Sequence, residues 1–235
     1  MPVVLLVVLA VEIELARRAP TLEDRPLQLG GRVGPAGPGP VLRVVWLGDS
    51  TAAGVGASGR SSALPVQVAQ ALEPPVQLVV LATSGARIAD VVDDQLPALT
   101  GLDPEVVFVS VGANDTVHFT GRRSFERRYR TLVEALPDDA RVVLLGVPDM
   151  GSIPRLAQPL RAVAGWRGRQ LDRVVREVAA ATGASYVDIA GATGPAFRAD
   201  PDRFYAGDDY HPSDEGYRLW AEAVLEVVGS AMLVG

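Results

Sequence analysis

The sequence predicts a three-layer α/β/α sandwich of the flavodoxin-like type, built on a five-stranded parallel sheet. Two observations carry this prediction. Short, nearly continuous apolar runs rich in β-branched residues recur along the chain, as in strands that are buried on both faces. Amphipathic stretches of helical periodicity separate these runs, and such repeated strand–helix alternation is typical of a doubly wound sheet. The expected order of the strands in the sheet is 2-1-3-4-5.

The predicted strands and helices alternate along the chain. Strands are expected over residues 41–47, 76–82, 106–111, 141–147 and 185–189. Helices are expected over residues 63–72, 88–99, 124–136, 166–182 and 213–228. In such a sheet, ligands bind outside the carboxyl ends of the strands, so the residues that follow each strand are the candidates for function.

The chain divides into three predicted parts. Residues 41–230 form one α/β domain, and the Gly/Pro-rich segment 30–40 is predicted to be a linker that holds neither helix nor sheet. Residues 1–29 are predicted to form an apolar helix or an anchor. Their apolar run, residues 2–11, is too short to span a membrane and lacks the flanks of a signal peptide. A helix that packs on the domain or a partner, a membrane anchor and a signal peptide all stay open.

The composition excludes several kinds of chemistry. The 235 residues are 48% hydrophobic, which excludes a mainly disordered chain. The chain has no cysteine and all 22 of its basic residues are arginine, which excludes thiol nucleophiles, cysteine metal sites and lysine chemistry. Only His118 and His211 supply imidazole, too few for a multi-histidine metal centre. The net charge of −6 argues against broad binding to nucleic acid or to an anionic membrane, since both need a basic surface.

Candidate catalytic residues stand near both ends of the predicted domain. Ser50 follows the first strand in WLGDSTAAG, where Gly48 permits a sharp turn that exposes the hydroxyl. In DDYHP, Asp208 precedes His211 by three residues, so a tight turn would let the carboxylate orient the imidazole as in a serine hydrolase. Each string is equally typical of residues that cap a helix, so neither decides the function alone.

Acyl transfer also needs donors for the oxyanion that develops in the transition state. The candidates are the backbone N–H groups of Ser50 and Gly85 and the side-chain amide of Asn114. Each of them follows a predicted strand, so the three donors can converge at one edge of the sheet.

Taken together, GDS at residues 48–50, Gly85, GAND at 112–115 and DDYHP at 208–212 resemble the four blocks of the SGNH/GDSL hydrolases, in the family's order. The resemblance covers about residues 41–228 and extends to the strings GVPDMGSIP and DYHPSDEGYRLWAEA, which are similar to those of some bacterial esterases. It implies Ser50 as nucleophile, His211 as base and Asp208 as the residue that orients the base. Ser50, Gly85 and Asn114 would form the oxyanion hole. Thr51 stands where the family often has leucine, so the resemblance does not predict the shape of the acyl and alcohol pockets.

Other patterns have simpler interpretations. The glycines of residues 54–59 match a dinucleotide-binding motif but stand too far from the strand, and are predicted to form a mobile loop beside the site. Three aspartates, Asp49, Asp115 and Asp149, suggest magnesium, but no lysine accompanies them. The arginine-rich stretch 122–130 is predicted to be the solvated face of a helix, with binding of acidic ligands as the alternative.

Two further sets of side chains flank the predicted site. His118 either lines the cleft or caps its turn, and the aromatic residues near His211 either wall the pocket or pack in the core. These aromatic residues are Phe204, Tyr205, Tyr210 and Tyr217.

The sequence thus predicts a serine esterase that hydrolyses carboxylic esters of short to medium acyl chains without a metal or organic cofactor. A lysophospholipase, a thioesterase or a carbohydrate deacetylase would use the same triad, and a non-catalytic binding module is the alternative of another class. The expected partner is a small-molecule ester, and residues 2–16 are the segment that would support membrane association. The expected location is cytoplasmic or membrane-associated rather than secreted.

Overall fold

The computed structural model describes residues 11–12, 14, 22 and 27–232. Within them, one sheet has the order β1-β3-β2-β4-β5-β6, with all neighbours parallel except β1 and β3. The strands are β1 (Gly31–Val33), β2 (Leu42–Gly48), β3 (Val76–Val80), β4 (Val106–Ser110), β5 (Arg141–Leu145) and β6 (Ser185–Val187). The five parallel strands have the predicted order, which confirms the doubly wound α/β class.

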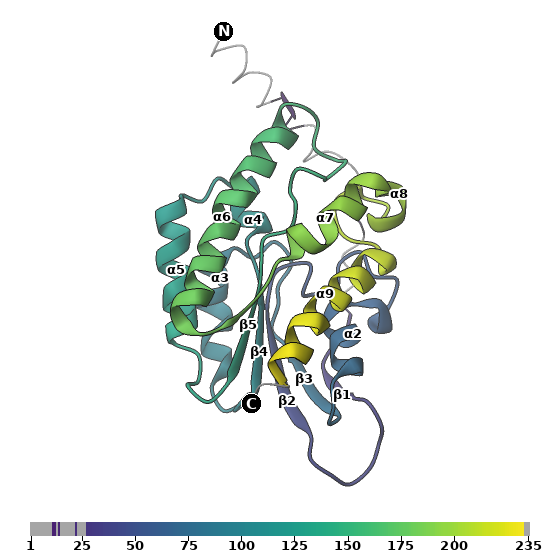
Figure 1. The fold of residues 1–235 in the computed structure, drawn as a ribbon, viewed down its shortest axis with the longest axis vertical. Helices are drawn as coiled ribbons and strands as arrows, with labels where there is room; N and C mark the ends of the chain where they lie inside the picture. The colour runs from purple at the N-terminus through teal and green to yellow at the C-terminus, as the bar shows by residue number, and fades with distance from the viewer. Residues whose placement is uncertain (1–10, 13, 15–21, 23–26, 233–235) are drawn as a thin grey trace.

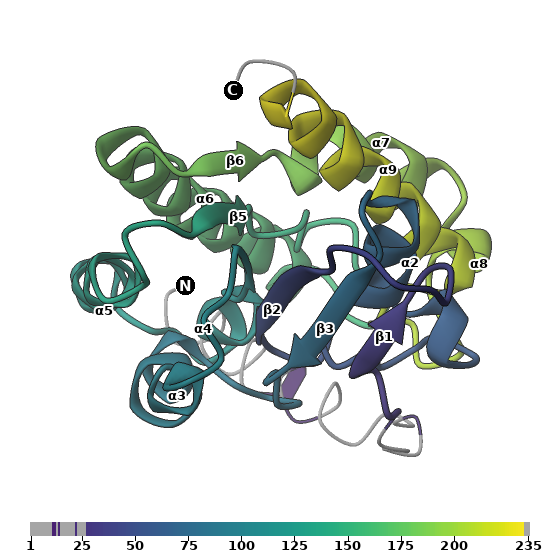
Figure 2. The same ribbon diagram turned by 90° about the horizontal axis from the view of Figure 1, so that it is seen from below.

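Helices cover both faces of this sheet, which gives the three layers seen in Figures 1 and 2. One layer holds α3 (Ile88–Asp90), the π-helical turn η2 (Val91–Gln95), the 3₁₀ turn η3 (Pro97–Leu99), α4 (Ala113–Val117), α5 (Arg122–Glu134) and α6 (Leu160–Thr182). The other holds the 3₁₀ turn η1 (Arg60–Ser62), α2 (Leu64–Ala71), α7 (Ile189–Ala199), α8 (Pro201–Phe204) and α9 (Asp214–Met232).

The central strands are buried on both faces, as their apolar runs predict. All five residues of β4 are buried, and the rings of Trp46 in β2 and Phe108 in β4 stack with their centroids 4.4 Å apart. Val45 pairs with Val107 across the same two strands. Because β-branched and aromatic side chains fill both faces, the register of β2 and β4 is fixed by packing.

The prediction of a linker without secondary structure over residues 30–40 is partly wrong. Residues 31–33, at its start, form β1, which pairs antiparallel with β3 and adds a sixth strand to the sheet. The side chain of Val33 is buried there, so this edge contributes to the core. The glycines and prolines of residues 34–40 follow as a loop.

Two predicted helices differ in the structure. The segment predicted as one helix over residues 88–99 is instead α3, η2 and η3, which are α-, π- and 3₁₀-helical in turn. Pro97 lacks the N–H that a continuous helix needs at that point. Helix α6 begins at Leu160, six residues before the predicted start at 166. The apolar periodicity did not predict three further short helices, α4, α7 and α8.

Most of the N-terminal segment, including the apolar run 2–10 of the predicted helix or anchor, lies outside the described residues. Val11, Glu12 and Glu14 are helical, and a carboxylate oxygen of Glu12 accepts the backbone N–H of Leu160 at 2.9 Å. This contact places residues 11–12 at the N-terminus of α6. In the part of the chain that the structure describes, no helix has the length and apolar character to cross a membrane.

Candidate active site

Ser50 stands on a tight turn at the carboxyl end of β2. A side chain on Gly48 would place its Cβ 2.2 Å from the carbonyl oxygen of Ser110 in β4, so only glycine fits beside that strand. The buried side chain of Gln95 holds the same residue, because its amide accepts the N–H of Gly48 and donates to its carbonyl, both at 2.8 Å. The turn is therefore fixed from two sides.

A buried carboxylate lies inside this turn. Oδ1 of Asp49 accepts the backbone N–H of Thr51 at 3.0 Å and its hydroxyl at 2.8 Å. The Thr51 hydroxyl also lies 3.0 Å from that of Ser110. Burial raises the pKa of Asp49 to about 6, although the hydrogen bonds from Thr51 oppose this shift.

His211 connects Ser50 to Asp208. Because a carboxylate can only accept, Nδ1 of His211 donates to Oδ2 of Asp208 at 2.6 Å, and Nε2 is left to accept the Ser50 hydroxyl at 3.0 Å. The connecting turn is tight: Asp209 has a positive φ of 56°, and its N–H donates to Ala206. The structure thus brings these three residues into one hydrogen-bonded series across 161 positions of sequence.

Asp208 is held in its ionised form by its neighbours. Burial raises the pKa of this carboxyl group, but hydrogen bonds from the His211 ring and from the backbone N–H groups of His211 and Tyr210 outweigh burial and lower the pKa. The largely buried guanidinium of Arg155 lies 3.9 Å from the same carboxylate. An ionised Asp208 is suited to stabilise a protonated imidazole.

The three predicted oxyanion donors lie around Ser50. Within the described part of the chain, no hydrogen bond uses the N–H of Ser50 or of Gly85. The amide of Asn114 donates one N–H to the carbonyl of Ala86 at 3.1 Å, which leaves its second N–H for a ligand. The adjacent Asp115 accepts the N–H of Ile88 at 2.9 Å, so α4 holds the loop that carries Gly85.

Two cavities meet at Ser50, Asn114, Tyr210 and His211. The inner cavity has a volume of about 30 Å³ and is walled by buried residues that include Met150, Phe197 and Trp220. The outer groove has a volume of about 320 Å³, and Gly85 lies on its wall. The apolar part of that wall consists of Val117, Phe119, Leu156, Leu160 and Ala164.

The remaining candidates take different places. His118 lines the outer groove, and its Nδ1 lies 2.9 Å from the carbonyl oxygen of Asn114. Tyr205 and Tyr210 wall the inner cavity, whereas Phe204 and Tyr217 belong to the core. The glycine motif of residues 54–59 lies beside the site, where a Cβ on Gly56 would meet the carbonyl oxygen of Pro212 at 2.3 Å.

Two residues near the site escaped the sequence analysis. Gln95 lies in a segment that reads as an ordinary amphipathic helix, so only the π-helical turn brings its amide to Gly48. Arg155 lies in an irregular loop far from Asp208 in sequence, and no pattern marks it. Among the described residues, no group of three or more histidine, aspartate or glutamate side chains is placed to hold a metal ion.

A serine, a histidine and an aspartate hydrogen-bonded in series at the carboxyl edge of an α/β sheet is the arrangement of the serine hydrolases. Comparison with known families narrows this class. A model of the GDSL-like lipase/acylhydrolase family matches residues 46–219, so the chain belongs to that family.

Individual relatives agree with this assignment. A GDSL-like esterase of Mycobacterium tuberculosis is 31% identical over 198 residues, which cover 81% of this chain and 63% of that protein. The chain therefore spans less than two thirds of that relative's length. A protein described as an SGNH hydrolase of Slackia heliotrinireducens has a TM-score of 0.62 at 23% identity, covering 80% of this chain and all of the other. An acetyl xylan esterase of Geobacillus stearothermophilus has a TM-score of 0.61 at 23% identity, covering 80% of this chain and 94% of the other. The fold is that of the SGNH hydrolases.

Proposed function

We propose that this chain is a serine esterase that hydrolyses carboxylic esters through a covalent acyl-enzyme. One observation carries the proposal: the His211 ring lies within hydrogen-bond distance of both the Ser50 hydroxyl and the Asp208 carboxylate. A nucleophile, its base and the group that orients the base are the three parts that acyl transfer needs.

In the proposed mechanism, Ser50 Oγ attacks the ester carbonyl carbon while His211 Nε2 takes its proton. Asp208 stabilises the resulting imidazolium. The N–H groups of Ser50 and Gly85 and the second N–H of Asn114 donate to the oxyanion of the tetrahedral intermediate. This intermediate collapses when His211 protonates the leaving alcohol, and the acyl group stays on Ser50. A water molecule, deprotonated by His211, then attacks the acyl-enzyme and releases the acid.

The unequal cavities support a preference for short to medium acyl chains. With a volume of about 30 Å³, the inner cavity suits a small group such as an acetyl methyl better than a long chain. The outer groove has apolar walls and room for a chain of several carbons. All three donor residues line the groove, whereas Gly85 does not line the inner cavity, so the ester carbonyl is proposed to enter from the groove.

Hydrolysis of p-nitrophenyl acetate, butyrate and octanoate by the purified protein tests the proposal. Ser50→Ala should lower kcat by more than about four powers of ten, because the nucleophile is lost. Its unchanged thermal unfolding would show that the fold persists. A fluorophosphonate probe should label the wild type and not the variant. Substantial turnover by Ser50→Ala would contradict the assignment.

The chain-length profile separates the alternatives that share the triad. Turnover confined to the acetate would favour a carbohydrate deacetylase, because only an acetyl group is small enough to use the inner cavity. Turnover of long acyl chains would favour a lysophospholipase or a thioesterase. Absence of fluorophosphonate labelling in a folded wild type would instead favour a non-catalytic binding module.

A further inference from the structure

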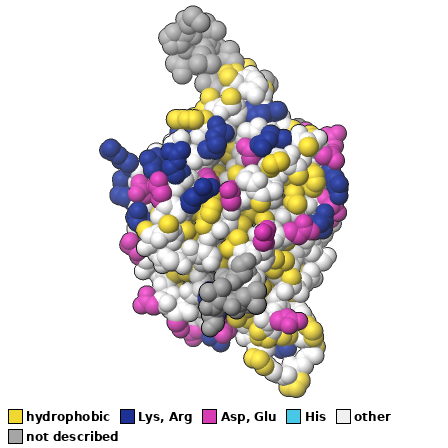
Figure 3. Space-filling model, viewed as in Figure 1, with side chains coloured by type: hydrophobic (Ala, Val, Ile, Leu, Met, Phe, Trp, Pro, Cys, Tyr) yellow, Lys and Arg dark blue, Asp and Glu magenta, His cyan; other side chains and the backbone are white. Residues whose placement is uncertain are grey.

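The arginines of this acidic protein gather in one layer. The whole chain carries 22 arginines and 28 acidic residues, whereas α5 and α6 together carry ten arginines and four acidic residues. Figure 3 shows dark blue side chains over these two helices in the upper half of the molecule, next to exposed apolar side chains. The α5–α6 face is therefore basic although the protein is negatively charged.

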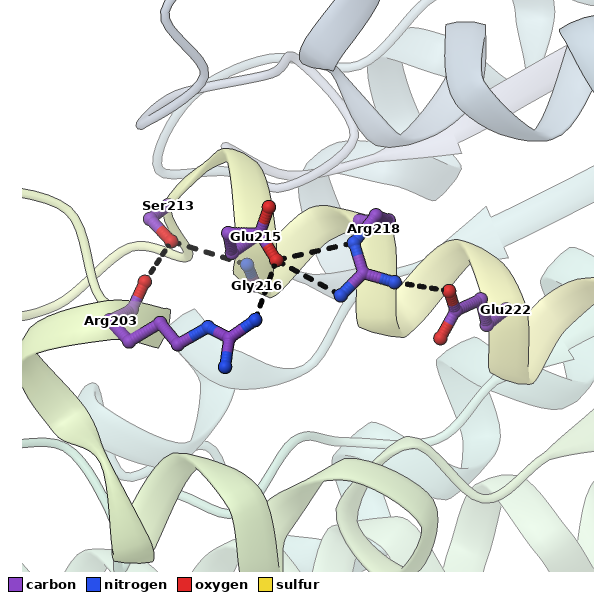
Figure 4. Close-up of polar contacts among 6 residues, drawn as sticks. All are labelled: Arg203, Ser213, Glu215, Gly216, Arg218 and Glu222. Atoms are coloured by element: carbon purple, nitrogen blue, oxygen red, sulfur yellow. Dashed lines mark hydrogen bonds and ion pairs between the residues drawn. The ribbon is translucent and has the colours of Figure 1, made fainter.

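The arginines of α8 and α9, on the other side of the sheet, are neutralised by contrast. Figure 4 shows Arg203 and Arg218 sharing Glu215, at 3.3 and 2.9 Å, and Arg218 also pairing with Glu222. On α5 and α6, four exposed arginines make no hydrogen bond or ion pair with any described residue: Arg123, Arg127, Arg169 and Arg173. Their charge is available to a partner.

The exposed apolar residues adjoin the same layer. Three large apolar side chains in the described part of the chain are strongly exposed: Val11 (53%), Phe119 (47%) and Trp166 (56%). Trp166 projects from α6, and the guanidinium of Arg167 on the same helix covers the Phe119 ring at 4.8 Å. Val11 neighbours Glu12, which binds the first residue of α6. All three therefore lie at the N-terminal half of α6.

This end of α6 also forms the wall of the outer groove. Leu160, Ala164 and Arg167 line the groove together with Phe119, and the groove leads to Ser50. The exposed apolar rim is thus continuous with the apolar path to the nucleophile. Large apolar side chains beside unpaired arginines are the composition by which proteins bind the interface of an anionic membrane.

We propose that the α5–α6 face, with Phe119 and Trp166 at its apolar end and Arg123, Arg127, Arg169 and Arg173 as its basic belt, docks on the surface of an anionic phospholipid bilayer. The charges of face and surface are complementary, and the groove then opens toward the lipid. Resting on the proposed esterase function, this docking assigns amphiphilic esters held at a lipid surface as the substrate class. In the sequence, the apolar run 2–11 leads directly into this face at Val11.

Tryptophan fluorescence offers a direct test, because the chain has only three tryptophans and two of them are buried. Trp46 is fully buried and Trp220 is 4% exposed, so a change in emission on binding reports Trp166. The Ser50→Ala full chain should be mixed with vesicles of phosphatidylcholine alone, or with 30% phosphatidylglycerol. With the anionic vesicles we expect co-sedimentation, a blue shift of the emission and quenching by brominated lipid, all weakened by 0.5 M NaCl. No binding to anionic vesicles at low salt would overturn the proposal.

Two matched double variants locate the binding face. Arg169→Gln/Arg173→Gln should bind the anionic vesicles about 30-fold more weakly, since each arginine near such a surface contributes about fivefold. Arg203→Gln/Arg218→Gln removes the same charge from the neutralised face and should bind within about threefold of the parent. Equal weakening by both would overturn the proposal, and so would a Trp166-dependent dimer that binds no vesicles, because the face would then join two copies of the chain. Thermal unfolding checks that both variants fold.

The two hypotheses fail in different ways. If the wild type hydrolyses soluble p-nitrophenyl esters but Ser50→Ala does not bind vesicles, the docking face is wrong and the esterase stands. If the protein binds anionic vesicles through α6 but hydrolyses no ester, the docking face stands and the substrate class falls with the esterase.

Discussion

Ser50 and His211, the proposed nucleophile and base, stand on two turns of the same design. In each turn, an aspartate Oδ1 accepts the N–H of the residue two positions on: Thr51 for Asp49, at 3.0 Å, and Tyr210 for Asp208, at 3.1 Å. Both carboxylates are buried. Yet the pKa of Asp49 is raised to about 6, while that of Asp208 is lowered.

The difference in pKa comes from the donors and from the deeper burial of Asp49. The carboxylate of Asp49 receives two hydrogen bonds from Thr51, and burial dominates its pKa. The carboxylate of Asp208 accepts a hydrogen bond from the His211 ring in addition to two from backbone N–H groups, and the guanidinium of Arg155 lies 3.9 Å away. Similar turns therefore give one carboxylate suited to stabilise a cation and another that shapes the backbone. Under the proposed mechanism, Asp208 takes part in the chemistry and Asp49 positions Ser50.

After Ser50→Ala, the largest effect should come from Asp208→Asn. The amide keeps the size of the side chain but cannot hold the imidazole in the tautomer that leaves Nε2 free to accept, so we expect kcat to fall by about four powers of ten. Ester hydrolysis measures this loss, with Ser50→Ala as the floor. A rate near that of the wild type would show that Asp208 only shapes its loop, as Asp49 does, and would end the distinction between the turns.

The sequence predicts those parts of the site that regular strands or a short turn bring together. Ser50, Gly85 and Asn114 follow predicted strands, and parallel strands bring their carboxyl ends together whatever the details of packing. For that reason the placing of these residues on one edge follows from the strand–helix alternation, whereas the alternation favours the order 2-1-3-4-5 without proving it. The sequence also predicts the tight turn before His211, because Asp208 precedes the histidine by only three residues.

The sequence does not predict the contacts that depend on irregular backbone. The amide of Gln95 meets Gly48 only because η2 is a π-helical turn, and a pattern of period 3.6 does not reveal it. β1 has three residues in a Gly/Pro-rich segment, too short for any alternation to show. The unequal volumes of the two cavities follow from side-chain packing around Ser50, which the motifs do not encode.

A smaller effect is expected from Thr51→Val, which tests the nucleophile turn. Valine keeps the shape but removes the hydroxyl that links Asp49 to Ser110, and it leaves a buried carboxylate with one donor fewer. We expect the free energy of unfolding at pH 7 to fall by about 2 kcal/mol. Urea denaturation measures this loss. Thr51→Ser, which keeps the hydroxyl, is the control, and equal loss in both variants would contradict the role given to the hydroxyl.

Asp49→Asn should have the smallest effect on rate, less than about tenfold, because the amide oxygen can still accept both bonds from Thr51. Its effect on stability should depend on pH. A folded-state pKa of about 6, against 3.8 as the ordinary value, means that between these values the folded chain keeps a proton that the unfolded chain has lost. The stability contributed by Asp49 is therefore full below pH 3.8 and lost as the pH rises past 6, a change of about 3 kcal/mol.

The amide of the Asp49→Asn variant does not titrate, so the stability of this variant relative to the wild type should improve by up to about 3 kcal/mol from pH 4 to pH 8. Urea denaturation at the two values measures it, and Asp208→Asn is the matched control. Asp208 has a lowered pKa, so its carboxylate stabilises the fold above its ordinary value of 3.8 and loses this effect on acidification below that value; its amide variant should change little relative to the wild type from pH 4 to pH 8 and become relatively more stable only below pH 4. A relative gain of similar size in both variants over this range would show that the two turns do not differ in charge. A gain confined to Asp49→Asn would tie that difference to the donors that only Asp208 has, the backbone N–H and the ring of His211.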